Sequence, residues 1–388
     1  MRMSAIELRK FVAPEIIFGS GAIERVGQYA ALYGARKALV VSDPGVIAAG
    51  WTGLVFAALN EAGIDHVSFS GVSPNPRTDE VMCGAEAHRS GACDLIVAVG
   101  GGSPLDCAKG IGIVVSNRGN VLDYEGIDRI PVPMPPLICI PTTAGTSADV
   151  SQFAIISDRA RHTKIAIISK AVVPDVAIID PRTLTTMDSY LTACTGMDAL
   201  VHAIEAYVSN AHSPLTDNHA LQAIRLIRKH LLPSIAAPHD LDHRSQMMLG
   251  SLEAGLAFSN ASLGAVHAMA HSLGGLLDLP HGECNAMLLE HVISYNFAQA
   301  GDRYRDVGCA LGLDAEKMDQ AECRAAVFGE VRRLRTAAGI SGGLGDRGVR
   351  SGDLGDLAAN ALRDACMVTN PRHPRHQRDI EVIYEEAL

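Results

Sequence analysis

Short, nearly continuous apolar runs recur through the first half of the chain. Runs rich in β-branched residues cover residues 37–42, 94–99, 137–140 and 176–179, and a weaker one covers 67–69. Strands that are apolar on both faces are typical of parallel sheets covered by helices. Between these runs, apolar positions three and four apart predict helices over residues 51–59 and about 79–90. The alternation predicts a doubly wound parallel α/β sheet.

One segment departs from this alternation. Residues 153–156 and 164–168 are two β-rich runs, and a charged turn at 158–162 separates them. Two such runs joined by a short polar turn predict a β-hairpin.

Beyond about residue 188 the pattern becomes helical. Long segments with helical spacing and few β-branched runs cover residues 191–209, 215–232, 244–258, 264–277, 315–338 and 351–366. We therefore predict an α/β domain over residues 1–185 and an all-α domain over residues 186–388. His281 stands between Pro280 and Gly282, which predicts a turn at that position.

Composition excludes several classes of partner. The 388 residues carry a formal net charge of −10, which disfavours a nucleic-acid partner. No apolar run reaches the roughly 18 residues that span a bilayer, and the charged first ten residues lack a signal-peptide core. The nine cysteines include no C-x-x-C pair, which favours a reducing compartment. We therefore expect a cytoplasmic protein that acts without nucleic acid or membrane.

Ionisable residues stand out in the apolar helical half. Asp198 and His202 are four residues apart, and His267 and His271 repeat this spacing, so each pair lies on one face of a helix. A single histidine on an apolar helix face is usually an ordinary core or surface residue. Here the surrounding segments have almost no other charge, and a buried ionisable group is costly unless it is paired or bound to a cation. With His281, one carboxylate and two or three imidazoles predict a site for a divalent first-row metal.

Two polar loops follow apolar strands in the first half. Residues 100–103 (G-G-G-S) come after the run at 94–99, and residues 141–147 (P-T-T-A-G-T-S) come after the run at 137–140. Glycines let backbone N–H groups approach a phosphate, and the following helix adds favourable partial charge. Each loop taken alone is equally consistent with a tight turn that binds nothing. Two such loops at the carboxyl ends of parallel strands indicate a nucleotide site.

The role of Asp43 stays open at this point. The usual dinucleotide fingerprint places an acidic residue about 20 positions after G-x-G-x-x-G, and this chain does not match it. Asp43 does end the first clear strand, where a carboxylate accepts from a ribose hydroxyl and repels a 2′-phosphate, which favours NAD over NADP. Alternatively, Asp43 only opens the turn D-P-G.

These residues together resemble the iron-containing alcohol dehydrogenase family, the group that includes lactaldehyde reductase and 1,3-propanediol dehydrogenase. The similarity covers nearly the whole chain. The specific blocks are G-G-G-S-P-L-D-C-A-K-G at 100–110, P-T-T-A-G-T-S-A-D-V at 141–150, G-M-D-A-L-V-H-A-I-E-A-Y at 196–207 and the segment 267–281. The resemblance implies hydride transfer between a primary alcohol or diol and NAD, with NADP disfavoured, in a homodimer or larger homo-oligomer.

The resemblance also assigns roles to residues. It implies that one divalent metal, usually Fe²⁺, is bound by Asp198, His202, His267 and His281. Three imidazoles and a carboxylate also suit Zn²⁺ or another divalent ion. His271 matches a histidine beside the open metal position and is the candidate proton relay. The substrate pocket is implied at Phe153, Phe258 and Cys366. The NAD site is implied at Asp43, Asn75, Gly100, Gly101, Gly102, Ser103, Asp106, Thr142, Thr143, Thr146, Ser151 and Lys164.

Other activities remain as alternatives. Glycerol dehydrogenases resemble this fold but use a three-ligand zinc site, and maleylacetate reductases do not need the metal. All four ligand positions are retained here, which argues against both. A non-catalytic nucleotide-binding module would bind NAD without turning over an alcohol. No sequence feature favours that module.

Overall fold

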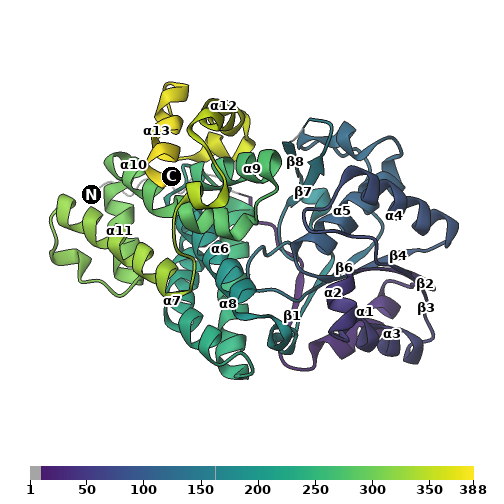
Figure 1. Ribbon diagram of the computed structural model, residues 1–388. Coiled ribbons are helices and arrows are strands. Elements are labelled where there is room, and N and C mark those ends of the chain that lie inside the picture. Colours follow the sequence, from purple (N-terminus) through teal and green to yellow (C-terminus); the bar gives the residue numbers. More distant parts are fainter. Residues whose placement is uncertain (1–9, 162) are drawn as a thin grey trace.

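The computed structural model describes residues 10–161 and 163–388 (Figure 1). The prediction that the chain has no signal-peptide core concerns residues 1–10, nearly all of which lie outside this part. Figure 1 shows a sheet-containing half built from the first part of the chain and a helical half built from the second. This division agrees with the predicted fold class.

Six parallel strands form the main sheet in the order β1-β9-β6-β4-β2-β3. Their bounds are β1 Glu15–Phe18, β2 Lys37–Val41, β3 Asp65–Phe69, β4 Leu95–Gly100, β6 Leu137–Pro141 and β9 Val176–Ile179. β3 follows β2 on one side, whereas β4 lies on the other side of β2. The direction of winding therefore reverses between β2 and β4, where open α/β sheets form a ligand crevice.

Helices cover both faces of this sheet, as the apolar runs predict. Alternate residues of β2 and β4, such as Val40 and Val97, pack with α1 (Val26–Leu32) and α3 (Trp51–Glu61). The intervening strand residues pack with α4 (Thr78–Ser90) and α5 (Gly102–Asn117) on the other face. Because successive strand side chains point to opposite faces, an apolar strand needs a layer on each side.

The predicted hairpin is also present. β7 (Phe153–Asp158) and β8 (Thr163–Ile168) pair antiparallel, and the short β5 (Gly126–Ile127) pairs with β8. β8 contacts a helix of the second half, α9 (Ala265–Leu277). The hairpin therefore extends from the sheet half to the helical half (Figure 1).

The second half is helical. Besides α9 its helices are α6 Ser189–Val208, α7 Pro214–Ala236, α8 Leu241–Ala261, α10 His281–Ala310, α11 Gln320–Ala337, α12 Leu354–Arg363 and α13 Gln377–Ala387. α6 is buried along nearly its whole length, which makes it the centre of this core. Within the described residues, no helix is both long and apolar enough to cross a membrane.

No helix was predicted over α10 or α13, and three smaller local features also differ from the sequence prediction. β1 is half-exposed and has no long apolar run, so the pattern did not predict it. His281 is not on a turn: Pro280 caps α10 and His281 is its first residue. Likewise Asp43 is the N-cap of a short helix, α2 (Pro44–Ala48), and its Oδ1 accepts from the Val46 amide at 2.9 Å. In both places the residues that signal a turn also start a helix.

Candidate functional site

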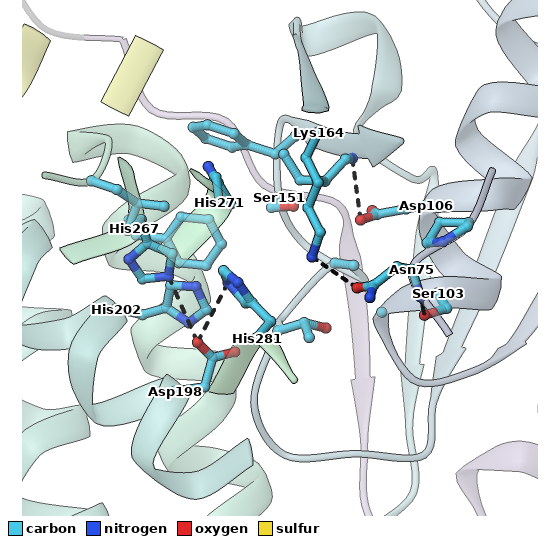
Figure 2. Close-up of a pocket in the computed structure, with 18 of the residues that line it drawn as sticks. Asn75, Ser103, Asp106, Ser151, Lys164, Asp198, His202, His267, His271 and His281 are labelled. Carbon is cyan, nitrogen blue, oxygen red and sulfur yellow. Dashed lines mark hydrogen bonds and ion pairs between the residues drawn. The ribbon is translucent and has the colours of Figure 1, made fainter. Parts of the chain in front are cut away.

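A cavity of about 160 Å³ lies between the two halves. One wall comes from the sheet half and the hairpin, and the other comes from α6, α8, α9 and the start of α10 (Figure 2). The residues predicted for the site that line it are Asn75, Gly102, Ser103, Asp106, Thr146, Ser151, Phe153, Lys164, Asp198, His202, Phe258, His267, His271 and His281.

The helical wall gathers one carboxylate and several imidazoles. Asp198 Oδ1 lies 3.7 Å from His267 Nε2 and 3.8 Å from His281 Nε2. One ligand atom from each of these three residues lies within 4.8 Å of the other two. The His202 ring stacks on that of His267, with ring centroids 4.5 Å apart. α6, α9 and α10 therefore bring four predicted ligands to one place.

Each of three histidines has a second partner that fixes its ring. His267 Nδ1 lies 2.7 Å from Glu205 Oε2, and His202 Nδ1 lies 3.2 Å from the Gly145 carbonyl oxygen. His271 Nδ1 lies 2.8 Å from Asp364 Oδ2. A carboxylate or carbonyl behind one ring nitrogen leaves the other nitrogen free for a ligand, as in most protein metal sites.

Burial and charge oppose one another in this cluster. Burial lowers the pKa of His202 to about 3 and the pKa of His281 well below its ordinary value, so both rings are neutral at pH 7. Burial alone would raise the pKa of Asp198, but the neighbouring histidines hold it well below its usual range. For His267 burial is likewise outweighed, and the Asp198 and Glu205 carboxylates raise its pKa to about 9. The cluster therefore holds an ionised Asp198 carboxylate beside two neutral imidazoles, His202 and His281, and a protonated His267.

Glycine at position 282 permits this assembly. A Cβ on Gly282 would lie 2.4 Å from the Cys194 carbonyl oxygen of α6. Any larger residue would push the first turn of α10 away from α6 and would carry His281 away from Asp198.

The donor set fits a divalent cation. Imidazole nitrogens and one carboxylate oxygen suit first-row metals, and these residues are buried except for the partly exposed His281. His281 Nδ1 is buried without a hydrogen-bond partner among the described residues. A buried cluster of this kind is costly when no cation is shared.

The loops at residues 100–103 and 141–147 contribute Gly102, Ser103 and Thr146 to the sheet wall. Gly101 caps α5, and the Thr142 amide donates to the Gly100 carbonyl oxygen at 2.9 Å, so the two predicted loops lie side by side. A Cβ on Gly102 would lie 2.8 Å from Thr146 Cγ2. The two loops follow β4 and β6 at one edge of the sheet, and the N-terminus of α5 adds partial positive charge there.

Lys164 and Asn75 connect the two walls. Lys164 Nζ donates to Asn75 Oδ1 at 2.8 Å, and Asn75 Nδ2 donates to Asp278 Oδ1 in the helical half at 2.7 Å. The backbone N–H of Asn75 also donates to Ser103 Oγ at 3.2 Å. Figure 2 shows the Lys164 side chain crossing the cavity toward Asn75. The cavity therefore has the Lys164 amine, whose pKa burial lowers, and a polar bridge opposite the histidines.

A buried lysine shapes the same wall from behind. Lys109 Nζ donates to the carbonyl oxygens of Ser151 and Phe153 at 3.0 and 2.7 Å. Burial lowers the pKa of Lys109 and raises that of nearby Asp106 to about 6. Lys109 thus fixes the backbone of Phe153. The ring centroids of Phe153 and Phe258 lie 5.7 Å apart, and the two rings form an apolar part of the cavity.

Several predicted site residues do not line the cavity within the described part of the chain. They are Asp43, Gly100, Gly101, Thr142, Thr143 and Cys366. Asp43 follows β2, which pairs with β4, so it lies at the same sheet edge as the glycine loop. Cys366 is fully buried, and its Sγ lies within 4.8 Å of ligand atoms of His271 and Asp364.

Sequence reasoning did not assign four residues that the structure brings to the site: Lys109, Glu205, Asn285 and Asp364. Glu205 had a detectable signal, because Asp198, His202 and Glu205 share one helix face at spacings of four and three. Asn285 follows His281 by one helical turn, but a helix was not predicted there. Asp364 lies 93 residues from its partner His271, and no local pattern reports such a contact.

Comparison with known proteins shows the family to which the chain belongs. A family model for iron-containing alcohol dehydrogenase matches residues 13–181, and one for the C-terminal part of the same family matches residues 192–388. The 1,3-propanediol dehydrogenase of Citrobacter freundii is 41% identical over 97% of this chain and 98% of its own length. The NAD-dependent methanol dehydrogenase of Bacillus methanolicus is 36% identical over 97% and 99%.

A solved structure gives the same result. The crystal structure of a 1,3-propanediol oxidoreductase matches with a TM-score of 0.95 and 39% identity, over 98% of this chain and all of that chain. The predicted resemblance is confirmed, and with it the expectation of alcohol and aldehyde oxidoreduction. The chain belongs to the iron-containing alcohol dehydrogenase family and is an oxidoreductase of alcohols and aldehydes.

Proposed function

We propose that this oxidoreductase uses NAD and Fe²⁺ to interconvert a primary alcohol or diol and its aldehyde. Residues 1–185 would bind the cofactor, and residues 186–388 would bind the metal and the substrate. The observation that carries the proposal is the meeting of Asp198, His202, His267 and His281 at one cavity wall, opposite Ser103 and Lys164 (Figure 2). Zn²⁺ and other divalent ions suit the same donors.

The cofactor half of the proposal rests on the loops at the sheet edge. Backbone amides of residues 100–103 at the α5 N-terminus suit a pyrophosphate, and Thr142, Thr143 and Thr146 offer hydroxyls beside them. Asp43, after the neighbouring strand, suits a ribose hydroxyl and disfavours NADP. The Bacillus methanolicus relative is an NAD-dependent methanol dehydrogenase, which supports the same choice.

The chain's own side chains have distinct tasks in this scheme. A cation held by Asp198, His202, His267 and His281 would supply Lewis acidity, and NAD would supply the hydride acceptor or donor. His271, held at Nδ1 by Asp364, takes or returns the alcohol proton at Nε2. Phe153 and Phe258 cover the reacting carbon and exclude water. Cytoplasmic location and assembly into a homodimer or larger oligomer stay predictions.

Replacement of His267 or His281 with alanine tests this proposal. Metal content and alcohol-dependent NADH formation are measured on anaerobically iron-loaded protein, with short diols and aliphatic alcohols as substrates. We expect both to fall by orders of magnitude in each variant. His219→Ala, which removes a histidine paired with Glu253, should leave both unchanged. Full activity in both site variants would reject the metal role.

A further inference from the structure

Asn285 is buried in the middle of the proposed metal ligands. It lies on α10 one turn after His281 and is fully buried. Its Nδ2 lies 2.6 Å from Asp198 Oδ1 and 3.1 Å from Nε2 of both His267 and His281. These are the three residues whose ligand atoms cluster within 4.8 Å. The NH₂ group therefore borders the space that a shared cation would occupy.

The other end of the amide has no partner. Asn285 Oδ1 is buried and accepts no hydrogen bond from any described residue. A cation repels N–H groups and attracts a carbonyl oxygen, and a half-turn of the amide exchanges the two. A cation that enters between Asp198, His267 and His281 must therefore displace the N–H group, and the unpaired oxygen is the group suited to replace it.

We propose that Asn285 is an additional metal-site residue: its Oδ1 faces the bound cation once the side-chain amide, whose NH₂ group lies against the same ligands, has turned over. The inference rests on the proposed metal site. An amide oxygen added to three imidazoles and a carboxylate gives five protein donors. This number favours Fe²⁺ or Co²⁺, which accept five or six ligands, over tetrahedral Zn²⁺.

A simpler role is the main competing explanation. Asn285 could act only by donating its N–H group to Asp198 and so hold that carboxylate in place. The two roles differ in what an aspartate at this position does. A carboxylate keeps the oxygen that faces the cation but has no N–H group to donate.

Chelator challenge of Co²⁺-loaded protein separates the two roles without measuring activity. Loss of Co²⁺ is followed by absorbance in the intact chain and in Asn285→Ala, Asn285→Asp and Asn117→Ala. Asn117 is the control, because it is a half-buried amide at the end of α5 whose partners, Ile113 and Val132, do not line the cavity. We expect Asn285→Ala to lose Co²⁺ about 10- to 100-fold more readily. Asn285→Asp should retain Co²⁺ at least as well as the intact chain, and Asn117→Ala should match the intact chain.

The outcomes separate this inference from the proposed function. If Asn285→Ala retains Co²⁺ as well as the intact chain does, the role of Asn285 is overturned. The role is also overturned if Asn285→Asp loses Co²⁺ as readily as Asn285→Ala does. Failure of the intact chain to take up Co²⁺ would instead reject the metal site itself. If Asn285→Ala does not fold, the near-isosteric Asn285→Asp provides the test. A Co²⁺ spectrum and Co²⁺ retention like those of the intact chain support the inference. Loss of both rejects it.

Discussion

The two walls of the cavity provide their chemistry in different ways. On the helical wall, side chains from α6, α9 and α10 converge, and partners such as Glu205 and Asp364 fix their rings. On the sheet wall, two loops pack closely against each other, and Gly102 already lies against Thr146. The helical wall is therefore most sensitive to the loss of a functional group. The sheet wall is most sensitive to the addition of an atom.

The largest expected effect concerns a partner behind a ligand on the helical wall. Glu205→Gln weakens the contact that fixes the His267 ring, so we expect metal affinity to fall about 10- to 100-fold. Competition with a chelator measures the affinity, and alcohol turnover should fall in parallel. Glu253→Gln is the control, because Glu253 pairs with His219 outside the cavity. Equal metal affinities in the two variants would contradict the role of Glu205.

A smaller effect is expected from an added methyl group on the sheet wall. Gly102→Ala places its Cβ 2.8 Å from Thr146 Cγ2, and overpacking of this kind costs about 1–3 kcal/mol. We expect the Kd for NAD, measured by NADH fluorescence or calorimetry, to rise about tenfold while metal content stays unchanged.

A second substitution sharpens this test. Adding Thr146→Ser to Gly102→Ala removes the crowded methyl group and keeps the hydroxyl, so NAD affinity should largely recover. Loss of metal from Gly102→Ala, or no recovery in the double variant, would argue against separate tasks for the two walls.

The smallest effect separates the two interpretations of Asp43. Asp43→Ala removes both the α2 cap and the carboxylate and should cost about 1 kcal/mol of stability. Asp43→Ser keeps a capping oxygen and loses only the charge. If the carboxylate repels a 2′-phosphate, both variants should use NADP several-fold better, and only Asp43→Ala should melt earlier. Unchanged cofactor preference in both would leave Asp43 as a helix cap alone.

Among the strands, the sequence predicted those that are buried on both faces, whereas among the helices it missed the largely buried α10. β2, β4, β6 and β9 are central strands, and a strand covered on both faces has to be apolar throughout. β1 lies at the sheet edge and is half-exposed, so it carries no such signal. At Pro280 and Asp43, a helix start and a turn use the same residue types, and the choice depends on what the next residues pack against.

Much of the candidate site could likewise be predicted, and the limit has a physical reason. Asp198, His202, His267 and His271 fall at helical spacings within apolar segments, which local sequence shows directly. The contacts of His271 with Asp364 and of Asn285 with Asp198 join distant segments and depend on how the helices pack. Residue spacing along a single helix does not predict such contacts between helices.

The most direct measurement is anomalous diffraction at the iron edge from crystals grown anaerobically with Fe²⁺. The account predicts one peak bonded to Asp198, His202, His267 and His281 at about 2.0–2.3 Å, on the side of the cavity facing Ser103. A peak at the neighbouring His271, Asp364 and Cys366 group instead, or none within reach of the four predicted ligands, would contradict it.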